Sequence, residues 1–220
     1  MTGTTQATRR RGALLLADIS GYTGFLQGVA DAHRVLIVES PEPPPAYGLM
    51  STLLDGIVAA LEPDFRLAKF EGDAVFAVSE DAVQGQAVLD TVGRCYDAFR
   101  TRLARAGIDW TCQCDACSLI GSLDLKFIVH HGTYVAQPIA GHEELLGPDV
   151  NTVHRLLKNH AREAIGAVPY ALITDAAAAT LGIQTADMVH AEEAYDGGPS
   201  FPVHLLVLQR TAALQEPVAE

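Results

Sequence analysis

Basic residues and long apolar segments are both scarce in this sequence. Its 15 lysines and arginines face 27 aspartates and glutamates, which gives a formal net charge of -12. Binding along a nucleic-acid backbone needs a basic surface, so nucleic acid is not expected as a partner. No segment reaches the roughly 18 consecutive apolar residues that a membrane span requires. The short apolar run near the N-terminus also lacks the features of a signal peptide. We therefore expect a cytoplasmic protein without membrane contact.

Cysteine is scarce too, with four in the chain. In a cytoplasmic protein these are more often thiols or metal ligands than disulfides. Cys112, Cys114 and Cys117 lie close together, and the two-residue spacing of the last pair is typical of zinc sites. Cys95, or a histidine such as those at 130 and 131, could supply a fourth ligand. Reduced thiols remain the alternative, because one Cys-x-x-Cys motif is unspecific.

The hydrophobic content of 49% allows a sizeable core, and the length suits one domain. We expect a single domain over residues 13–210, between a flexible N-terminus (1–12) and a C-terminal tail (211–220). Two irregular insertions interrupt this domain. They are a proline-rich segment at 39–48 and a cysteine-containing segment at 109–122.

Hydrophobic periodicity and turn residues predict an α+β fold. Strands are expected at 13–18, at 65–79 (two strands around a turn at 71–73), at 125–141 with a glycine break, at 170–174 and at 202–209. Helices are expected at 24–37, 49–62, 81–107, 148–163 and 175–182. The first six elements in this order form a ferredoxin-like βαββαβ core with helices on one face of the sheet. A β-α-β extension follows at the C-terminus.

Two aspartates stand where strands of this core end. Asp18 closes the first strand, and Asp73 lies in the hairpin turn between the second and third strands. The topology can place these strands side by side. Neighbouring carboxylates repel unless a cation lies between them, and Mg²⁺ or Mn²⁺ prefers such oxygen ligands. The alternative is that both are ordinary turn residues, since aspartate is common in turns.

Four motifs along the chain resemble those of the class III nucleotidyl cyclases. They are "LADISGYTGFL", "KFEGDAVFAV", "LKFIVHHGTYVA" and "LLGPDVNTVHRLLKN". They occur in the order found in that family and extend from Asp18 to Lys158. One such motif would be weak, but four in register are specific.

The resemblance implies a function for each motif. Asp18, Ile19 and Asp73 would bind two Mg²⁺ or Mn²⁺ ions over a nucleoside triphosphate. Asn151 would orient the ribose, and Arg155 would stabilise charge on the α-phosphate. The residues implied to bind the nucleotide are Gly21, Tyr22, Thr23, Lys69, Glu144 and Lys158.

The resemblance also implies a homodimer, in which one subunit supplies the aspartates and its partner supplies Asn151 and Arg155. Lys69 and Glu144 occupy the positions that choose the base. A lysine there is typical of adenine recognition, because it can donate a hydrogen bond to the ring nitrogen N1. The expected reaction is conversion of ATP to 3′,5′-cyclic AMP and pyrophosphate.

Some features depart from the family pattern. The usual phosphate-binding lysine near the C-terminal hairpin is absent, and Lys158, Arg162 or a residue of the partner subunit could replace it. Glu71 stands beside the metal-binding turn, where an apolar residue is usual, and could act as an extra ligand. Two alternatives therefore stay open. One is a weak or inactive nucleotide sensor with the same fold, and the other is a cyclase for GTP or a pyrimidine nucleotide.

Overall fold

The first strand is buried on both of its faces, which dictates a layer of helices on each side. Leu14 and Leu16 point into one hydrophobic core, whereas Leu15 and Ala17 point into another. This follows from the two-residue period of a strand. The computed structural model describes residues 7–34, 45–80, 83–109, 112, 114–166, 169–195 and 199–209.

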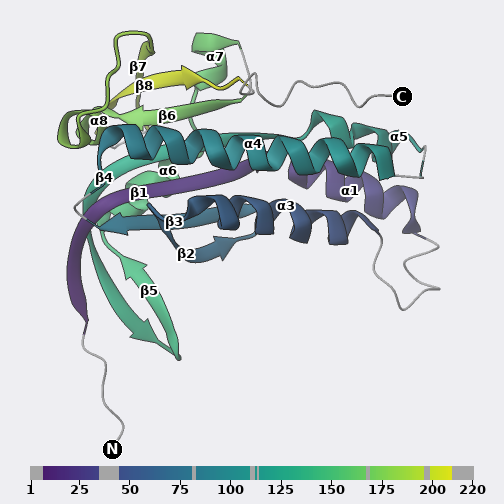
Figure 1. The fold of residues 1–220 in the computed structure, drawn as a ribbon, viewed down its shortest axis with the longest axis horizontal. Coiled ribbons are helices and arrows are strands. Elements are labelled where there is room, and N and C mark those ends of the chain that lie inside the picture. The colour runs from purple at the N-terminus through teal and green to yellow at the C-terminus, as the bar shows by residue number, and fades with distance from the viewer. Residues whose placement is uncertain are drawn as a thin grey trace, which may run out of the picture.

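The described strands form one sheet of eight strands (Figure 1). In chain order they are β1 (Thr8–Ser20), β2 (Arg66–Glu71), β3 (Ala74–Glu80), β4 (Asp124–Ile139), β5 (His142–Leu146), β6 (Tyr170–Thr174), β7 (Val189–Glu193) and β8 (Phe201–Val207). Their spatial order is β2-β3-β1-β4-β6-β8-β7, and β5 pairs with the far end of β4. The central strand β1 runs antiparallel to both β3 and β4.

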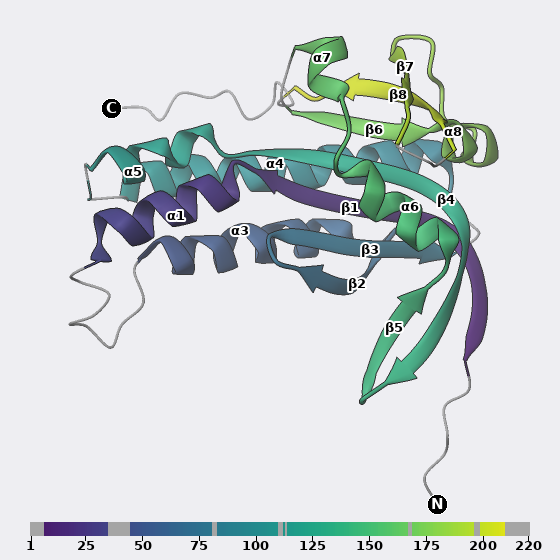
Figure 2. The same cartoon turned by 180° about the vertical axis from the view of Figure 1, so that it is seen from behind.

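Helices cover both faces of this sheet. They are α1 (Tyr22–Ala32), α3 (Pro45–Leu61), α4 (Gly85–Asp109), α5 (Asp115–Ser118), α6 (Pro148–Leu156), α7 (Ala161–Ile165) and α8 (Asp175–Leu181), with a 3₁₀ turn η1 (Leu119–Ser122). Buried residues of α1, α3, α4 and α8 share one core, and those of α6 and α7 share the other. Figure 2 shows α6 lying over β1 on the face opposite α4. Within the described residues, no helix is long and apolar enough to cross a membrane.

The structure confirms the predicted α+β fold and its βαββαβ core, with α1, α3 and α4 on one face. Several boundaries differ. β1 extends beyond 13–18 at both ends, α3 begins at 45 within the proline-rich segment, and β5 and β7 were not predicted. Residues 39–44 of that segment lie outside the described residues, as do 1–6 and 210–220.

The helix expected at 148–163 is two helices. The Asn159 side chain donates to the Leu156 carbonyl (2.7 Å) and accepts from the Ala161 N–H (3.0 Å), which ends α6 and begins α7. Asparagine competes with helical hydrogen bonds in this way. In contrast, β4 runs unbroken through Gly132. A Cβ at that position would lie 2.3 Å from Cγ of Asp149, so glycine allows the start of α6 to approach the strand.

Candidate active site

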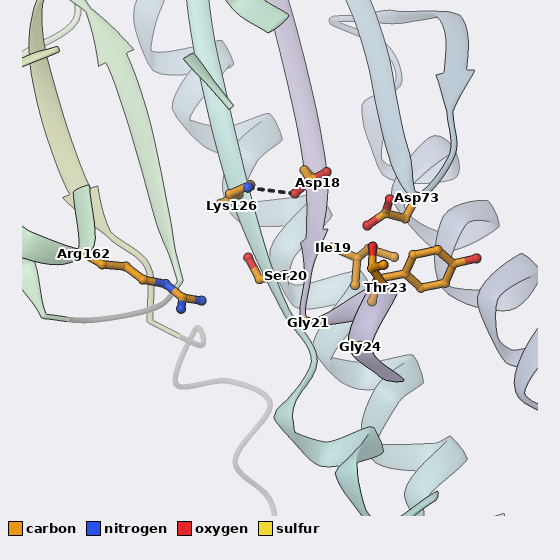
Figure 3. Close-up of a pocket in the computed structure, with 10 residues that line it drawn as sticks. Asp18, Ile19, Ser20, Gly21, Thr23, Gly24, Asp73, Lys126 and Arg162 are labelled. Atoms are coloured by element: carbon orange, nitrogen blue, oxygen red, sulfur yellow. Dashed lines mark ion pairs between the residues drawn. The ribbon is translucent and has the colours of Figure 1, made fainter. Parts of the chain in front are cut away.

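Asp18 and Asp73 meet at one end of the sheet. Asp18 pairs in register with Ala74, the residue that directly follows Asp73. The turn between β2 and β3 depends on Gly72, whose φ of 64° is in the left-handed region that favours glycine. Figure 3 shows both carboxylates directed toward the same space at the start of α1. The sequence prediction that the fold brings these two acids together is therefore in agreement with the geometry.

These acids line a cavity of about 300 Å³. The loop that leads from β1 into α1 forms its floor, and Gly21 at the bend of this loop has a φ of 88°. The cavity is lined by Asp18, Ile19, Ser20, Gly21, Tyr22, Thr23, Gly24, Asp73, Lys126 and Arg162. All three residues predicted to bind metal and the predicted nucleotide-binding residues of the first motif are among them.

The cavity strongly perturbs the Asp73 carboxyl group. Burial and the negative charge of Asp18 raise the pKa of Asp73 to about 6. Asp18 is partly neutralised by Lys126, whose Nζ lies 3.0 Å from its Oδ2. The two residues are direct partners on β1 and β4, so their side chains lie on the same face of the sheet. Lys126 thus pairs with one of the two carboxylates, that of Asp18.

The donors in this cavity suit a hard divalent cation. The Asp18 and Asp73 carboxylates and the backbone of Ile19 offer oxygen atoms only, which Mg²⁺ and Mn²⁺ prefer. Burial, and after it repulsion from Asp18, raise the pKa of Asp73, and a bound cation would offset both effects. The residues present therefore fit the metal ions that the family resemblance implies.

The raised pKa gives a prediction for the metal-free protein. The folded state holds a proton on Asp73 more tightly than the unfolded chain, so this contribution to stability is present at acidic pH and lost as pH rises through about 6. Asp73→Asn removes the loss. In the presence of chelator at pH 7.5, we expect the variant to exceed the wild type by about 1 kcal/mol in unfolding free energy, after allowance for solvent screening. Urea titrations at pH 4.5 provide the comparison, because the difference should shrink there to about a third as the pH approaches the ordinary pKa of an aspartate.

The two predicted base-selecting residues lie close together at the edge of the sheet. The Lys69 Nζ is 3.7 Å from Oε2 of Glu144 and 2.8 Å from Oε1 of Glu71. Glu71 also contacts Nε2 of His154 at 2.6 Å. Partial burial disfavours the charged form of both residues. The hydrogen bonds among them outweigh it, so the pKa of Lys69 is raised and that of Glu71 is lowered. Glu71 is thus engaged by Lys69 and His154 and does not line the aspartate cavity, contrary to its expected use as an extra ligand.

The residues predicted to bind the ribose and phosphates from α6 and the turn that follows it do not line this cavity. Asn151, Arg155 and Lys158 are all exposed. The Arg155 guanidinium lies over the Tyr195 ring, 5.2 Å from its centroid. The helix itself is fixed by Asp149, which accepts hydrogen bonds from the Thr133 N–H (2.6 Å) and contacts His130 (3.3 Å). Within one chain, therefore, the structure does not bring Asn151 or Arg155 to the two aspartates.

Two cationic residues of the cavity were not assigned to the metal site from the sequence. For Lys126 the sequence offers one signal, which is its position in an otherwise apolar strand. Arg162 is one of the candidates to replace the missing phosphate-binding lysine. It reaches the cavity from α7 (Figure 3), whereas Lys158 is not part of the lining.

The cysteine segment differs from its prediction in one ligand. Cys112, Cys114 and Cys117 do cluster, but the fourth residue within reach is His33. Cys95 is buried elsewhere, with its Sγ 3.6 Å from the Ile57 carbonyl oxygen, because it faces α3 from the inner side of α4. His130 and His131 lie in the buried part of β4, where His130 contacts Thr174 and Asp149. These positions correct the expectation that Cys95 or a β4 histidine completes the set.

The fold is similar to those of solved nucleotidyl cyclases. The adenylyl cyclase CyaB from P. aeruginosa matches with a TM-score of 0.63 over 93% of this chain and 97% of that chain, at 14% identity. The guanylyl cyclase Cya2 matches with a TM-score of 0.61 over 97% of this chain and 99% of that chain, also at 14% identity. The class III cyclase fold that the four motifs indicated is thus confirmed. Identities this low establish the fold and leave the substrate undecided.

Sequence comparison finds a relative in Mycobacterium tuberculosis, "Uncharacterized protein Rv2561/Rv2562". The two are 33% identical over 132 residues, and this region spans only 60% of each chain. The family described as "Protein of unknown function (DUF2652)" matches residues 50–164, more than half of the chain. That region includes Asp73 and the whole of α6. The chain therefore belongs to the DUF2652 family, and its fold is that of the class III nucleotidyl cyclases.

Proposed function

We propose that this protein is an adenylyl cyclase that converts ATP to 3′,5′-cyclic AMP and pyrophosphate. The observation that carries the proposal is the pair of carboxylates, Asp18 and Asp73, that line one cavity. A protein that used the fold as a scaffold alone would have no reason to keep an unneutralised Asp73 beside Asp18. The raised pKa of Asp73 indicates that the arrangement is costly unless a cation binds.

The residues of the cavity divide the reaction between them. Two Mg²⁺ or Mn²⁺ ions bound by Asp18, Asp73 and Ile19 would lower the pKa of the ribose 3′-hydroxyl and neutralise the triphosphate. The 3′-oxygen attacks the α-phosphorus, the bond to the leaving pyrophosphate breaks, and the hydroxyl proton passes to solvent. Arg162 is placed to bind the leaving phosphates, since it lines the same cavity.

A second subunit completes the site in this proposal. Asn151 and Arg155 are exposed on α6 and therefore free to reach a neighbouring chain. A two-fold dimer would bring α6 of each subunit to the aspartates of the other and form two equivalent sites. Asn151 of the partner subunit would then orient the ribose. Arg155 of the partner subunit would stabilise the charge that develops on the α-phosphate.

The alternative function is a nucleotide sensor without turnover. It is favoured by the Lys126–Asp18 ion pair of 3.0 Å, which competes with a metal for that carboxylate. It is also favoured by the sequence after Lys158, which contains no lysine to bind the triphosphate. In this case the cavity would bind a nucleotide without bringing it to the geometry of in-line attack.

Product formation from each of ATP, GTP, CTP and UTP with Mn²⁺, read by mass spectrometry, tests the proposal. Cyclic AMP from ATP, in large excess over the other cyclic products, is the expected result. A different cyclic product would keep the reaction and change the base. Absence of any cyclic product, from dimeric protein that binds Mn²⁺ and ATP in calorimetry, would reject the cyclase and leave the sensor.

Base choice gives a separate prediction for Lys69. Its ammonium is held between Glu71 and Glu144, where it can donate to N1 of adenine. Lys69→Ala should therefore lower kcat/KM for ATP by about 10- to 100-fold while changing activity with GTP little. Arg66→Ala is the matched control. It removes another cation of β2, one that pairs with Glu143 of β5. Equal losses with both nucleotides would show that Lys69 acts only on the local structure.

A further inference from the structure

A compact set of sulfur and nitrogen ligands lies at the opposite end of α1 from the aspartate cavity. Nε2 of His33 lies 3.3 Å from Sγ of Cys117, 3.4 Å from Sγ of Cys114 and 3.6 Å from Sγ of Cys112. These four atoms all lie within 4.8 Å of one another. None of these three cysteines forms a disulfide. We propose that His33, Cys112, Cys114 and Cys117 bind one structural zinc ion, which ties the C-terminal end of α1 to α5.

The distances from the histidine nitrogen to the three sulfurs fit a tetrahedral zinc site. Zinc bonds of about 2.3 Å to sulfur and about 2.05 Å to nitrogen place neighbouring ligand atoms about 3.8 Å (S to S) and about 3.6 Å (S to N) apart. The three nitrogen–sulfur distances fall between 3.3 and 3.6 Å. Only small movements would bring the four atoms around one ion. Three cysteines and one histidine are an established ligand set for structural zinc, and thiolates disfavour Mg²⁺ or Ca²⁺.

The backbone around these residues supports a built site. Cys114 caps the first turn of α5, and its Sγ accepts a hydrogen bond from the Cys117 N–H at 3.4 Å. Such N–H donors to sulfur stabilise metal-bound thiolates. Cys117 is buried, and the other three ligand residues are half-buried, so the set lies under the surface yet within reach of an entering ion.

The helices that carry the ligands are in direct contact. Figures 1 and 2 show α1 and α5 side by side at one end of the molecule. A Cβ placed on Gly28 would lie 3.4 Å from Cβ of Ala116, which indicates close packing. However, α5 has a single turn and little apolar area with which to hold α1. A metal crosslink would supply what this small contact lacks.

The position of the site gives it a structural consequence for the cavity. His33 directly follows α1, and the first residues of α1 line the aspartate cavity. Zinc would therefore fix the far end of the helix whose near end carries Tyr22, Thr23 and Gly24. This inference does not depend on the proposed reaction, because zinc content is measured without any nucleotide.

Metal analysis of the full chain tests the site. Protein purified without chelator should contain about one zinc per chain. His33→Ala and Cys114→Ser should reduce zinc affinity by more than about 100-fold, whereas His33→Cys, which restores a fourth soft ligand, should retain zinc. Cys95→Ala is the matched control and should keep the full content, since Cys95 lies outside the cluster.

Cobalt exchange keeps the test decisive if the variants do not fold. Co²⁺ added to the zinc-depleted wild type should give thiolate-to-cobalt charge-transfer absorption with the intensity of three thiolates. Three results would overturn the proposal. The protein could contain no zinc and take up no cobalt, it could carry only iron, or it could form a disulfide among these cysteines when freshly purified. Loss of zinc from Cys95→Ala would overturn it as well. Amide hydrogen exchange in α1 should accelerate by at least about tenfold on zinc removal, and unchanged exchange would reject the tie between α1 and α5.

Discussion

Asp73→Asn is expected to abolish cyclic nucleotide formation and leave the fold intact. The substitution preserves the shape of the side chain but removes one of the two carboxylates that bind the metal ions in the proposed mechanism. Electrostatic stabilisation of a phosphoryl-type transition state through such a group contributes at least about 100-fold to rate. Saturating Mn²⁺ should not restore kcat, because Asp18, the carboxylate that remains, is already paired with Lys126.

The experiment compares initial rates of wild type, Asp73→Asn and Asp31→Asn. Asp31 provides a matched control. It is an exposed acid of α1, and its carboxylate accepts hydrogen bonds from the Gln27 side chain. Its replacement should leave the rate unchanged. Retention of more than about a tenth of wild-type activity in Asp73→Asn would contradict the assigned role. Folding is checked by urea unfolding, where the variant is expected to be at least as stable as the wild type at pH 7.5.

The core of the fold could be predicted because its signals are local. The apolar run of β1, the glycine turn at 72 and the long amphipathic α4 each define their element within a few residues. Boundaries that depend on tertiary contacts could not be predicted. β5 is short, is largely exposed apart from Leu145 and contains two glutamates, and it exists because it pairs with the end of β4. Similarly, the division of α6 from α7 depends on the hydrogen bonds of one asparagine.

The candidate sites show the same division between local and long-range information. Their motifs predict Asp18 and Asp73 as site residues, and the strand register explains why they meet. No motif predicts Lys126 or His33 as a site residue, because each reaches its site from an element distant in sequence. His33 lies 79 residues from Cys112, so no spacing rule could connect them. Residue type alone also favours Cys95 as a zinc ligand. In the structure Cys95 is buried away from the other cysteines, and burial raises the pKa of its thiol to about 12.

Mixing two inactive variants should restore activity if the site is shared between subunits. Asp73→Asn lacks a metal-binding acid, and Arg155→Ala lacks the guanidinium that the partner subunit would contribute. Each homodimer has two defective sites and should be inactive. Each heterodimer has one site with both defects and one with neither. Random exchange makes half of the dimers mixed, so an equal mixture should recover about one quarter of wild-type activity.

The recovery separates a shared site from a site built within one chain. If Arg155 acted on the aspartates of its own subunit, every site in the mixture would carry one defect, and activity would stay absent. The exposure of Arg155 and its contact with Tyr195 favour the shared arrangement, since neither residue lines the aspartate cavity. Pairing Asp73→Asn with Asp18→Asn gives the control, because both defects then fall on the same half of the site and no mixed dimer contains an intact one. Recovery with Arg155→Ala but not with Asp18→Asn would establish that two chains together form each active site.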